Sequence, residues 1–158
     1  MQASNLSPFV VWLAAAKYLI AAADEKKLDI LYFDGESVFE TPELREKHPY
    51  YIHGYEYELD LPAPVTGIAF FCTAKEDKKY RVSPCMAFFR RQLLLKNSIR
   101  FIDGILHEDN AFNFACLMSA ERVWHTAEKF YFRLVRTGSV MTSTKSFFHV
   151  YGYLTCLQ

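Results

Sequence analysis

The sequence has few cysteines and lacks any Cys-x-x-Cys pair. The four that occur are far apart: Cys72, Cys85, Cys116 and Cys156. Secreted domains use closely patterned cysteines as a disulfide framework, and structural zinc sites need ligands at short spacing. The cysteines are therefore interpreted as small buried hydrophobic residues in a reducing compartment, and we expect a cytoplasmic protein.

Its charges show no excess of one sign. Lysine plus arginine and aspartate plus glutamate number 18 each, and the pI is about 7.0. A nucleic-acid-binding domain is expected to carry a basic stripe, but only short clusters occur here, such as Arg90-Arg91 and Lys78-Lys79. We therefore expect no nucleic-acid partner.

No long apolar run free of charge is present. Residues 8–27 are mostly apolar but carry Lys17 near their centre, whereas a membrane helix needs about 20 nearly uninterrupted apolar residues. A signal peptide would need a positive charge ahead of the run, and residues 1–7 contain none. We expect instead a buried amphipathic helix, with Ser7 as its N-cap and Pro8 at its first position.

The chain is rich in apolar and aromatic residues. Of its 158 residues, 51% are hydrophobic and 16% are aromatic, which is enough for one sizeable core and argues against disorder. No repeat, linker or low-complexity segment interrupts it. We expect a single domain over residues 1–158.

Short apolar runs of helical and strand periodicity alternate along the chain. We expect strands at 28–33 (stopped by Asp34-Gly35), 82–91, 100–103, 122–127 and 129–136, helices at 66–76, 92–97, 110–118 and 144–157, and an irregular segment at 35–64. This mixture predicts an α/β or α+β fold.

The most informative stretch is GILHEDNAF, residues 104–112. It places His107, Glu108 and Asp109 side by side among apolar residues, where a loop turns into a helix. Asp109 could cap this helix by accepting a backbone N–H, or it could be held in a cleft as a general base. Ligation of a metal by His107 and an acid is a third alternative, although three consecutive residues rarely all face one ion. The residues alone leave these alternatives open.

A second candidate group follows the last expected strand. Arg136, Ser139 and Thr142 carry guanidinium and hydroxyl donors that could bind phosphate oxygens. The alternative is a solvated turn in which Gly138 supplies an unusual backbone conformation.

The irregular segment is dense in tyrosine. Tyr50, Tyr51, Tyr55 and Tyr57 could stack against a sugar, or they could pack a long loop onto the core, which is the more common arrangement. Two isolated histidines are interpreted as structural: His125 and His149.

Four features occur together in the C-terminal half of the chain. They are Gly-Ile-x-His-Glu-Asp at 104–109, Phe112 in a helix that ends in alanine before Arg122-Val123, the aromatic strand Phe130-Tyr131-Phe132-Arg133, and Arg-x-Gly-Ser-x-Met-Thr at 136–142. In this order and spacing they resemble the C-terminal half of family-2 glycosyltransferases with a GT-A fold, the bacterial enzymes that build capsular, lipopolysaccharide and other surface glycans. The resemblance extends from about Ala14 to the end and is most specific over residues 100–143.

The resemblance implies an α/β fold with a mixed sheet and flanking helices. It also implies an inverting sugar transfer from a nucleotide-sugar to a hydroxyl of a glycan or lipid-linked acceptor, which would place the enzyme at the periphery of a membrane. The aspartate of the Glu-Asp pair is the catalytic base in such enzymes, a role that carries over onto Asp109, with Glu108 in support. One carboxylate suffices, because a divalent cation stabilises the leaving diphosphate.

The chain also departs from this family. Complete enzymes bind Mg²⁺ or Mn²⁺ through an Asp-x-Asp motif in a nucleotide-binding half, and no Asp-x-Asp occurs here. The nearest pattern, Glu58-Leu59-Asp60, follows no apolar strand. We therefore expect an acceptor-side half without its donor-binding half, and no metal site in this chain alone. The candidate substrate-binding residues are His107, Arg136, Ser139 and Thr142.

Such a half is expected to bind itself or a donor-binding half, through its apolar N-terminal helix. It could be a truncated product, an alternative start or part of a split enzyme. The alternative from a different class is a non-catalytic remnant or interaction module that retains the acceptor-side half of the fold.

Overall fold

The chain forms one mixed sheet within the residues that the computed structural model describes, 8–139 and 146–157. Its strands are β1 (Ile30–Phe39), β2 (Ala87–Phe89) and β3 (Val123–Val135), in the order β2-β1-β3. β1 pairs with β2 antiparallel and with β3 parallel. A parallel pair needs a long crossover connection, and the residues between β1 and β3 supply it.

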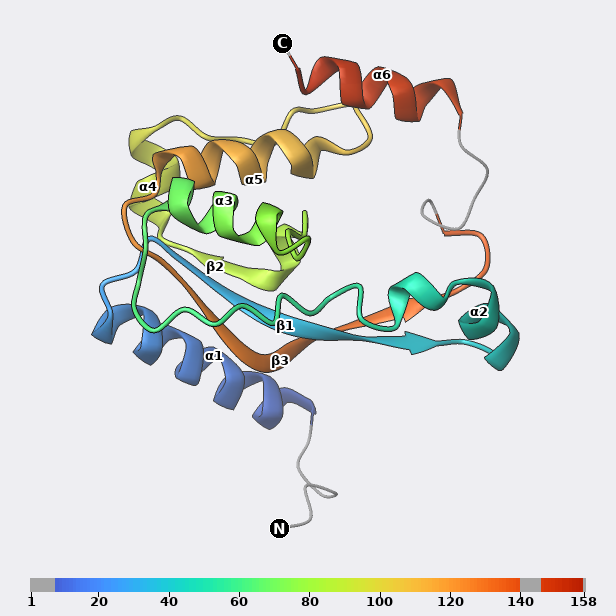
Figure 1. The fold of residues 1–158 in the computed structure, drawn as a ribbon, viewed down its shortest axis with the longest axis horizontal. Coiled ribbons are helices and arrows are strands. Elements are labelled where there is room, and N and C mark those ends of the chain that lie inside the picture. The colour runs from blue at the N-terminus through green and yellow to red at the C-terminus, as the bar shows by residue number, and fades with distance from the viewer. Residues whose placement is uncertain (1–7, 140–145, 158) are drawn as a thin grey trace.

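Helices flank the sheet on both faces. α1 (Pro8–Glu25) lies on one face, and α3 (Gly67–Glu76) and α5 (Glu108–Ser119) lie on the other (Figure 1). The shorter elements are α2 (Pro42–Lys47), α4 (Arg91–Lys96), α6 (Phe147–Thr155) and 3-10 turns at Pro49–Tyr51 and Pro84–Met86. The predicted α/β architecture, a mixed sheet with flanking helices, is confirmed.

The centre of the core is the first half of β1. Ile30, Leu31 and Tyr32 are fully buried, because this strand has neighbours on both edges and helices on both faces. Tyr32 stacks on Phe70 of α3, with ring centroids 4.8 Å apart. The strand is therefore a fixed platform for the residues that follow it, beginning with Asp34.

The strand boundaries differ from those predicted. β1 continues through Asp34-Gly35 instead of stopping there, and the two strands expected at 122–127 and 129–136 are the single strand β3. The register shifts on both sides of Asp34, where β3 carries the extra residues. A glycine at position 35 lets the two strands lie this close together, because a Cβ at that position would lie 2.7 Å from the carbonyl oxygen of Tyr131.

Three other expectations were wrong in part. Residues 100–103 form no strand, since Phe101 instead stacks flat on Phe112 of α5 with centroids 4.0 Å apart. Only Ala87–Phe89 of the expected strand at 82–91 pairs with the sheet, after a turn that begins at Pro84. The irregular segment contains α2, whose first turn is capped by Thr41.

The N-terminal helix is confirmed as a helix, but among its described side chains, those of residues 13–25, most are not buried. Leu19 is buried, whereas Leu13, Tyr18 and Ile20 are exposed. Its expected N-cap, Ser7, lies outside the described residues. None of the helices in the described ranges is both long enough and apolar enough to span a membrane.

Candidate functional site

His107, Glu108 and Asp109 lie at the start of α5. The helix predicted at 110–118 is present and begins two residues earlier, at Glu108. His107 therefore occupies the N-cap position, with a left-handed backbone (φ 67°) and no side-chain capping bond. The interpretation of Asp109 as the N-cap is wrong: its carboxylate belongs to the first turn, where the positive end of the helix favours the ionised form.

The carboxylate of Asp109 is half-buried and held by its neighbour. Asn110 Nδ2 donates to Asp109 Oδ1 at 3.2 Å and to the carbonyl oxygen of His107 at 3.1 Å. Burial raises the pKa of Asp109 above its usual value, and the negative charge of Glu108 raises it further, against opposing effects of His107 and of backbone hydrogen bonds. A carboxylate with a raised pKa is a stronger base than an ordinary one once it is ionised.

α6 covers the loop that carries His107. The His107 ring stacks on Tyr153 with centroids 4.1 Å apart, and Cys156 Sγ lies 3.4 Å from the His107 carbonyl oxygen. Gly152 allows the close approach, because a Cβ there would lie 1.9 Å from the carbonyl oxygen of Leu106. α6 thus fixes the loop that leads into the first turn of α5.

A cavity of about 450 Å³ runs along α5 beside this turn. It is lined by Phe71, Lys75, Tyr80, Val82, Asn110, Ala111, Phe114, Tyr153, Cys156 and Leu157. Burial and then the charge of Asp109 raise the pKa of Tyr80 to about 12, so its phenol is a neutral hydroxyl near that carboxylate at physiological pH. Asn110 and Ala111 of the first turn line this cavity, whereas Asp109 is not among its lining residues. The cavity combines an apolar surface with a few polar groups beside that turn.

Arg136 and Ser139 follow the end of β3, and Thr142 lies outside the described residues. β3 runs opposite to α5, so its end and the first turn of α5 face the same side of the molecule (Figure 1). The loop start is anchored beside β1, since the backbone N–H of Thr137 donates to Glu40 Oε2 at 3.2 Å. The trio therefore lies at the start of α5, and Arg136 and Ser139 lie just past the end of β3.

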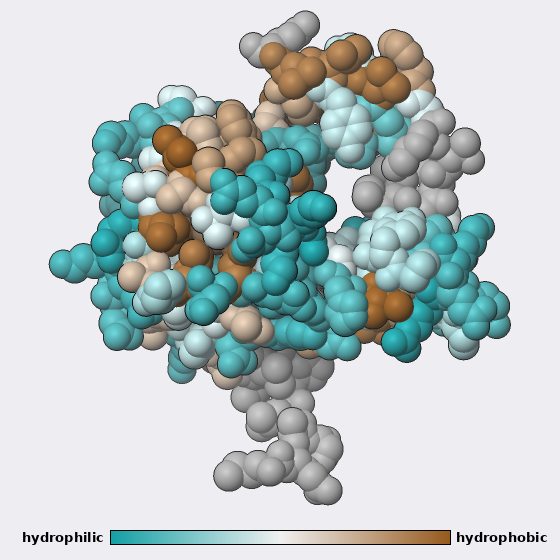
Figure 2. All heavy atoms as spheres, in the orientation of Figure 1, coloured by the Kyte–Doolittle hydropathy of each residue, from teal (hydrophilic) through white to brown (hydrophobic). Residues whose placement is uncertain are grey.

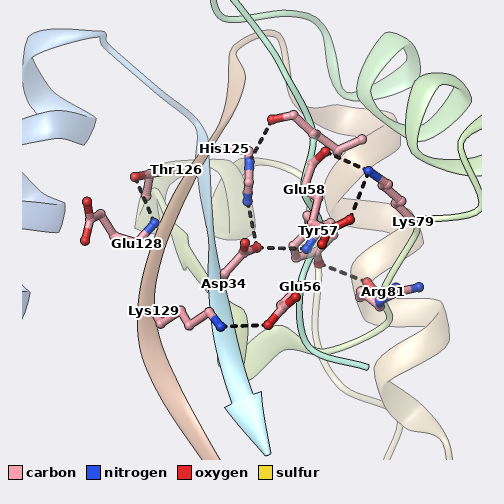
Figure 3. Close-up of polar contacts among 11 residues, drawn as sticks. Asp34, Glu56, Tyr57, Glu58, Lys79, Arg81, His125, Thr126, Glu128 and Lys129 are labelled. Atoms are coloured by element: carbon pink, nitrogen blue, oxygen red, sulfur yellow. Dashed lines mark hydrogen bonds and ion pairs between the residues drawn. The ribbon is translucent and has the colours of Figure 1, made fainter. Parts of the chain in front are cut away.

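A buried polar network links β1, β3 and the tyrosine-rich segment (Figure 3). His125 Nε2 lies 2.8 Å from Asp34 Oδ1, and the same oxygen accepts the backbone N–H of Tyr57 at 2.8 Å. His125 Nδ1 lies 3.2 Å from the carbonyl oxygen of Leu59. In the sequence, Asp34 is a carboxylate at the end of an apolar run, and no nearby residue indicates its partner. That partner, His125, lies 91 residues later in the chain.

No metal centre is formed by the described residues: nowhere in 8–139 and 146–157 do three or more His, Cys, Asp or Glu side chains gather in a way that could hold an ion. Glu58 of the Glu58-Leu59-Asp60 pattern instead pairs with Lys79, with the charged atoms 3.1 Å apart. Neither this pattern nor the trio therefore fits a divalent cation.

No family model matches the chain, and no curated protein matches it. Several solved structures are similar to this chain in fold. TarS 1–349 of S. aureus in complex with UDP-GlcNAc superimposes with a TM-score of 0.56 at 20% identity, over 84% of this chain and 34% of that one. A structure of TarS of the same organism gives 0.53 at 22% identity over 76% of this chain and 19% of that one, and TarS 1–349 alone gives 0.51 at 22% identity, over 74% and 31%. The chain spans about a third of the length of TarS 1–349, and it has the fold of that part of TarS.

Proposed function

We propose that the chain acts in sugar transfer from a nucleotide-sugar to an acceptor hydroxyl in surface glycan synthesis, as the acceptor-side half of an inverting glycosyltransferase, with Asp109 as general base. The observation that carries the proposal is the placement of Asp109: half-buried, raised in pKa and held by Asn110 at the start of α5. The motifs of the chain and its likeness to a protein that binds UDP-GlcNAc support it.

The chemistry needs one base. A hydroxyl attacks the anomeric carbon opposite the diphosphate, and its proton passes to a carboxylate within about 3 Å as the new bond forms. A hydrolase would instead need two carboxylates flanking the scissile bond, about 5 to 9.5 Å apart. The Tyr80 hydroxyl and the cavity beside α5 would orient the acceptor hydroxyl toward Asp109.

The neighbours of Asp109 have supporting roles in this proposal. Besides burial, the charge of Glu108 keeps the pKa of Asp109 raised, and His107 would contact the substrate. Arg136, Ser139 and Thr142 would donate to the phosphate oxygens of the nucleotide-sugar. Mg²⁺ or Mn²⁺, if used, would be held by a donor-binding half, because the residues described here do not fit it.

The test is transfer from UDP-GlcNAc to a glycan acceptor by the chain, alone and joined to a donor-binding half. Asp109→Asn keeps the shape and removes the base, so turnover should fall by about 10²- to 10⁴-fold. Asp103→Asn, which changes an exposed carboxylate in the loop before α5, is the matched control and should leave turnover unchanged. Equal turnover in wild type and Asp109→Asn would contradict the proposal.

A second candidate function is that of a non-catalytic interaction module. The observation that favours it is the outer surface of α6, where large apolar side chains are exposed, among them Phe147 (74%), Phe148 (68%) and Leu154 (58%). Figure 2 shows hydrophobic atoms gathered over α6 at the top of the molecule. A module of this kind would bind a partner without any dependence on Asp109, which separates the two candidates.

A further inference from the structure

A second cavity lies beneath the tyrosine-rich segment that connects α2 to α3. Its volume is about 320 Å³, and it is lined by Tyr50, Tyr51, Gly54, Tyr55, Arg81, Val82 and Ser83. Three aromatic rings, an arginine and a serine hydroxyl in one small cavity combine apolar faces with hydrogen-bond donors. This is the chemistry that holds a sugar ring, whose C–H face is apolar and whose rim is polar.

The aromatic wall is fixed before any ligand arrives. The Arg133 guanidinium lies over the rings of Tyr51 and Tyr55, at 5.3 and 5.4 Å, and donates to the Tyr55 hydroxyl. Tyr50 packs against Tyr51 with centroids 4.5 Å apart, and its hydroxyl lies 2.7 Å from His48 Nδ1. Little side-chain freedom would be lost on binding, which favours affinity.

Tyr50 differs from the other two tyrosines in its exposure. Tyr51 and Tyr55 are 8% exposed and pack the segment onto the sheet, whereas Tyr50 is 62% exposed. Packing of the loop therefore accounts for two of the rings but not for Tyr50. An ordered but exposed aromatic ring at the edge of a cavity is suited to stack on a ligand.

Arg81 supplies the charge. It is the charged residue among the described side chains that line the cavity, and its Nε is buried without a hydrogen-bond partner in the described ranges. Its backbone is fixed, because its carbonyl oxygen accepts the Tyr57 hydroxyl at 3.0 Å (Figure 3). The guanidinium also donates from Nη1 to the carbonyl oxygen of Lys78 at 3.3 Å, and an anionic oxygen is the partner that its remaining donors would bind best.

The cavity is connected to the Asp109 turn by the chain itself. Val82 lines both this cavity and the one along α5. Tyr80, two residues earlier, lies near enough to Asp109 that, besides burial, the charge of Asp109 raises its pKa. Tyr80 lines only the cavity along α5, and Arg81 and Ser83 line only this one, so residues 80–83 lie between the two cavities and Val82 borders both. A glycan that spans the two would have one unit among the tyrosines and its reacting unit beside α5.

We propose that the cavity formed by Tyr50, Tyr51, Tyr55 and Arg81 is a carbohydrate subsite for an anionic sugar unit, with Tyr50 stacking on the ring and Arg81 binding the acidic group. That the unit belongs to the acceptor glycan rests on the proposed function. The acidic group is the carboxylate of a uronic acid or a phosphate ester, since both offer the oxygens that a guanidinium binds.

The experiment titrates the chain with four probes by isothermal calorimetry and ligand-observed NMR. The probes are a tetrasaccharide of alternating glucuronate and N-acetylglucosamine, the same tetrasaccharide with its carboxylates reduced to alcohols, glucose 6-phosphate and inorganic phosphate. We expect at least one acidic sugar to bind more tightly than both the reduced tetrasaccharide and inorganic phosphate, and which one binds identifies the acidic group.

Two variants assign the binding to the cavity. Arg81→Gln should lower the affinity for the acidic sugar about tenfold or more, because a charge-assisted hydrogen bond is lost. Tyr50→Ala should lower it about three- to tenfold, because the stacking ring is lost. The controls are Arg91→Gln and Tyr18→Ala, exposed residues elsewhere, and thermal melts confirm that each variant is folded. Unchanged affinity in both cavity variants, or inorganic phosphate binding as tightly as the sugars, would overturn the inference.

The outcome is separable from that of the proposed function. Sugar binding that depends on Tyr50 and Arg81 supports the subsite even if transfer never occurs. Transfer that depends on Asp109 but is indifferent to Tyr50→Ala and Arg81→Gln would overturn the subsite and leave the proposed function intact.

Discussion

At the scale of single residues, the environment of Asp109 works against stability. The pKa of Asp109 is raised in the folded chain, mainly by burial. At pH values near and above the ordinary pKa of an aspartate, the carboxyl group is therefore more often protonated in the native state than in the unfolded chain. The contribution of this group to stability therefore falls as pH rises through the folded pKa. A carboxylate kept at a site that disfavours its charge is a common sign of function.

We predict that Asp109→Asn stabilises the chain at pH 7, because it removes a charge that is partly desolvated. The gain in melting temperature should shrink as pH falls and vanish below the usual pKa of an aspartate, where the wild-type carboxyl is protonated in both states. Thermal melts between pH 3 and 8 measure this. Asp103→Asn, at an exposed carboxylate, should show no such gain. Destabilisation by Asp109→Asn at pH 7 would mean that the carboxylate serves the helix start.

A second residue-scale prediction concerns the buried pair of Asp34 and His125, whose side chains are 5% and 1% exposed. His125→Ala leaves the carboxylate buried without its partner, which should cost about 3 to 5 kcal/mol of unfolding free energy. Asp34→Asn keeps an oxygen for the Tyr57 N–H and should cost less. Urea denaturation gives both values. His53→Ala, which removes an exposed partner of Glu56, should cost no more than about 1 kcal/mol.

At the scale of elements, the sequence predicted helices better than strands. Thr66 ahead of an apolar run marks the start of α3, and its hydroxyl accepts the Ala69 N–H at 3.2 Å as a cap should. The ends of β1 and β3 depend instead on each other: the register shift at Asp34 and the contact of Gly35 with Tyr131 join residues almost 100 positions apart. No local pattern carries that information.

In the candidate site, too, residues that are adjacent in the sequence could be predicted, whereas those contributed by distant segments could not. Adjacency along the chain was enough to place Glu108 and Asp109 together at a helix start, and the structure agrees. The Tyr80 hydroxyl and the cover provided by α6 come from distant segments, so only the folded chain shows them. The apolar pattern of residues 144–157 predicted a helix but did not indicate what that helix packs against. The contact of α6 with Leu106 depends on Gly152, and a glycine has no side chain whose hydrophobicity could indicate a contact.

We predict that Gly152→Ala lifts α6 away from the loop before α5. The added methyl group would lie 1.9 Å from the Leu106 carbonyl oxygen, and backbone on both sides prevents a local adjustment. Amide hydrogen exchange in α6 should become faster while the core strands stay protected, because α6 packs outside the core. Val150→Ala removes an exposed side chain from the same helix and should leave exchange unchanged. Unaltered protection of α6 in Gly152→Ala would refute this account of its docking.

At the scale of the whole molecule, the two candidate functions share one surface property. Apolar side chains remain exposed on α1 and, more extensively, on α6. Contiguous apolar surface of this kind marks interaction sites in soluble proteins. The N-terminal helix is the contact expected from sequence. Among the side chains that the structure describes, however, the apolar ones of α6 are more exposed than those of α1, so we place the contact on α6. Figure 2 shows hydrophobic atoms gathered there.

We therefore predict that the isolated chain self-associates, or binds a donor-binding half when one is supplied, through α6. Size-exclusion chromatography with light scattering should show a mass above that of the 18.4 kDa monomer, together with binding of an apolar dye. The double variant Phe147→Ser, Phe148→Ser should reduce both signals, since it removes two of the most exposed rings without touching the Gly152 contact. Leu13→Ser, Ile20→Ser tests α1 in the same way and should have the smaller effect. A stable monomer that binds neither dye nor donor-binding half would contradict the prediction. A larger effect of the α1 variant would assign the contact to the N-terminal helix instead.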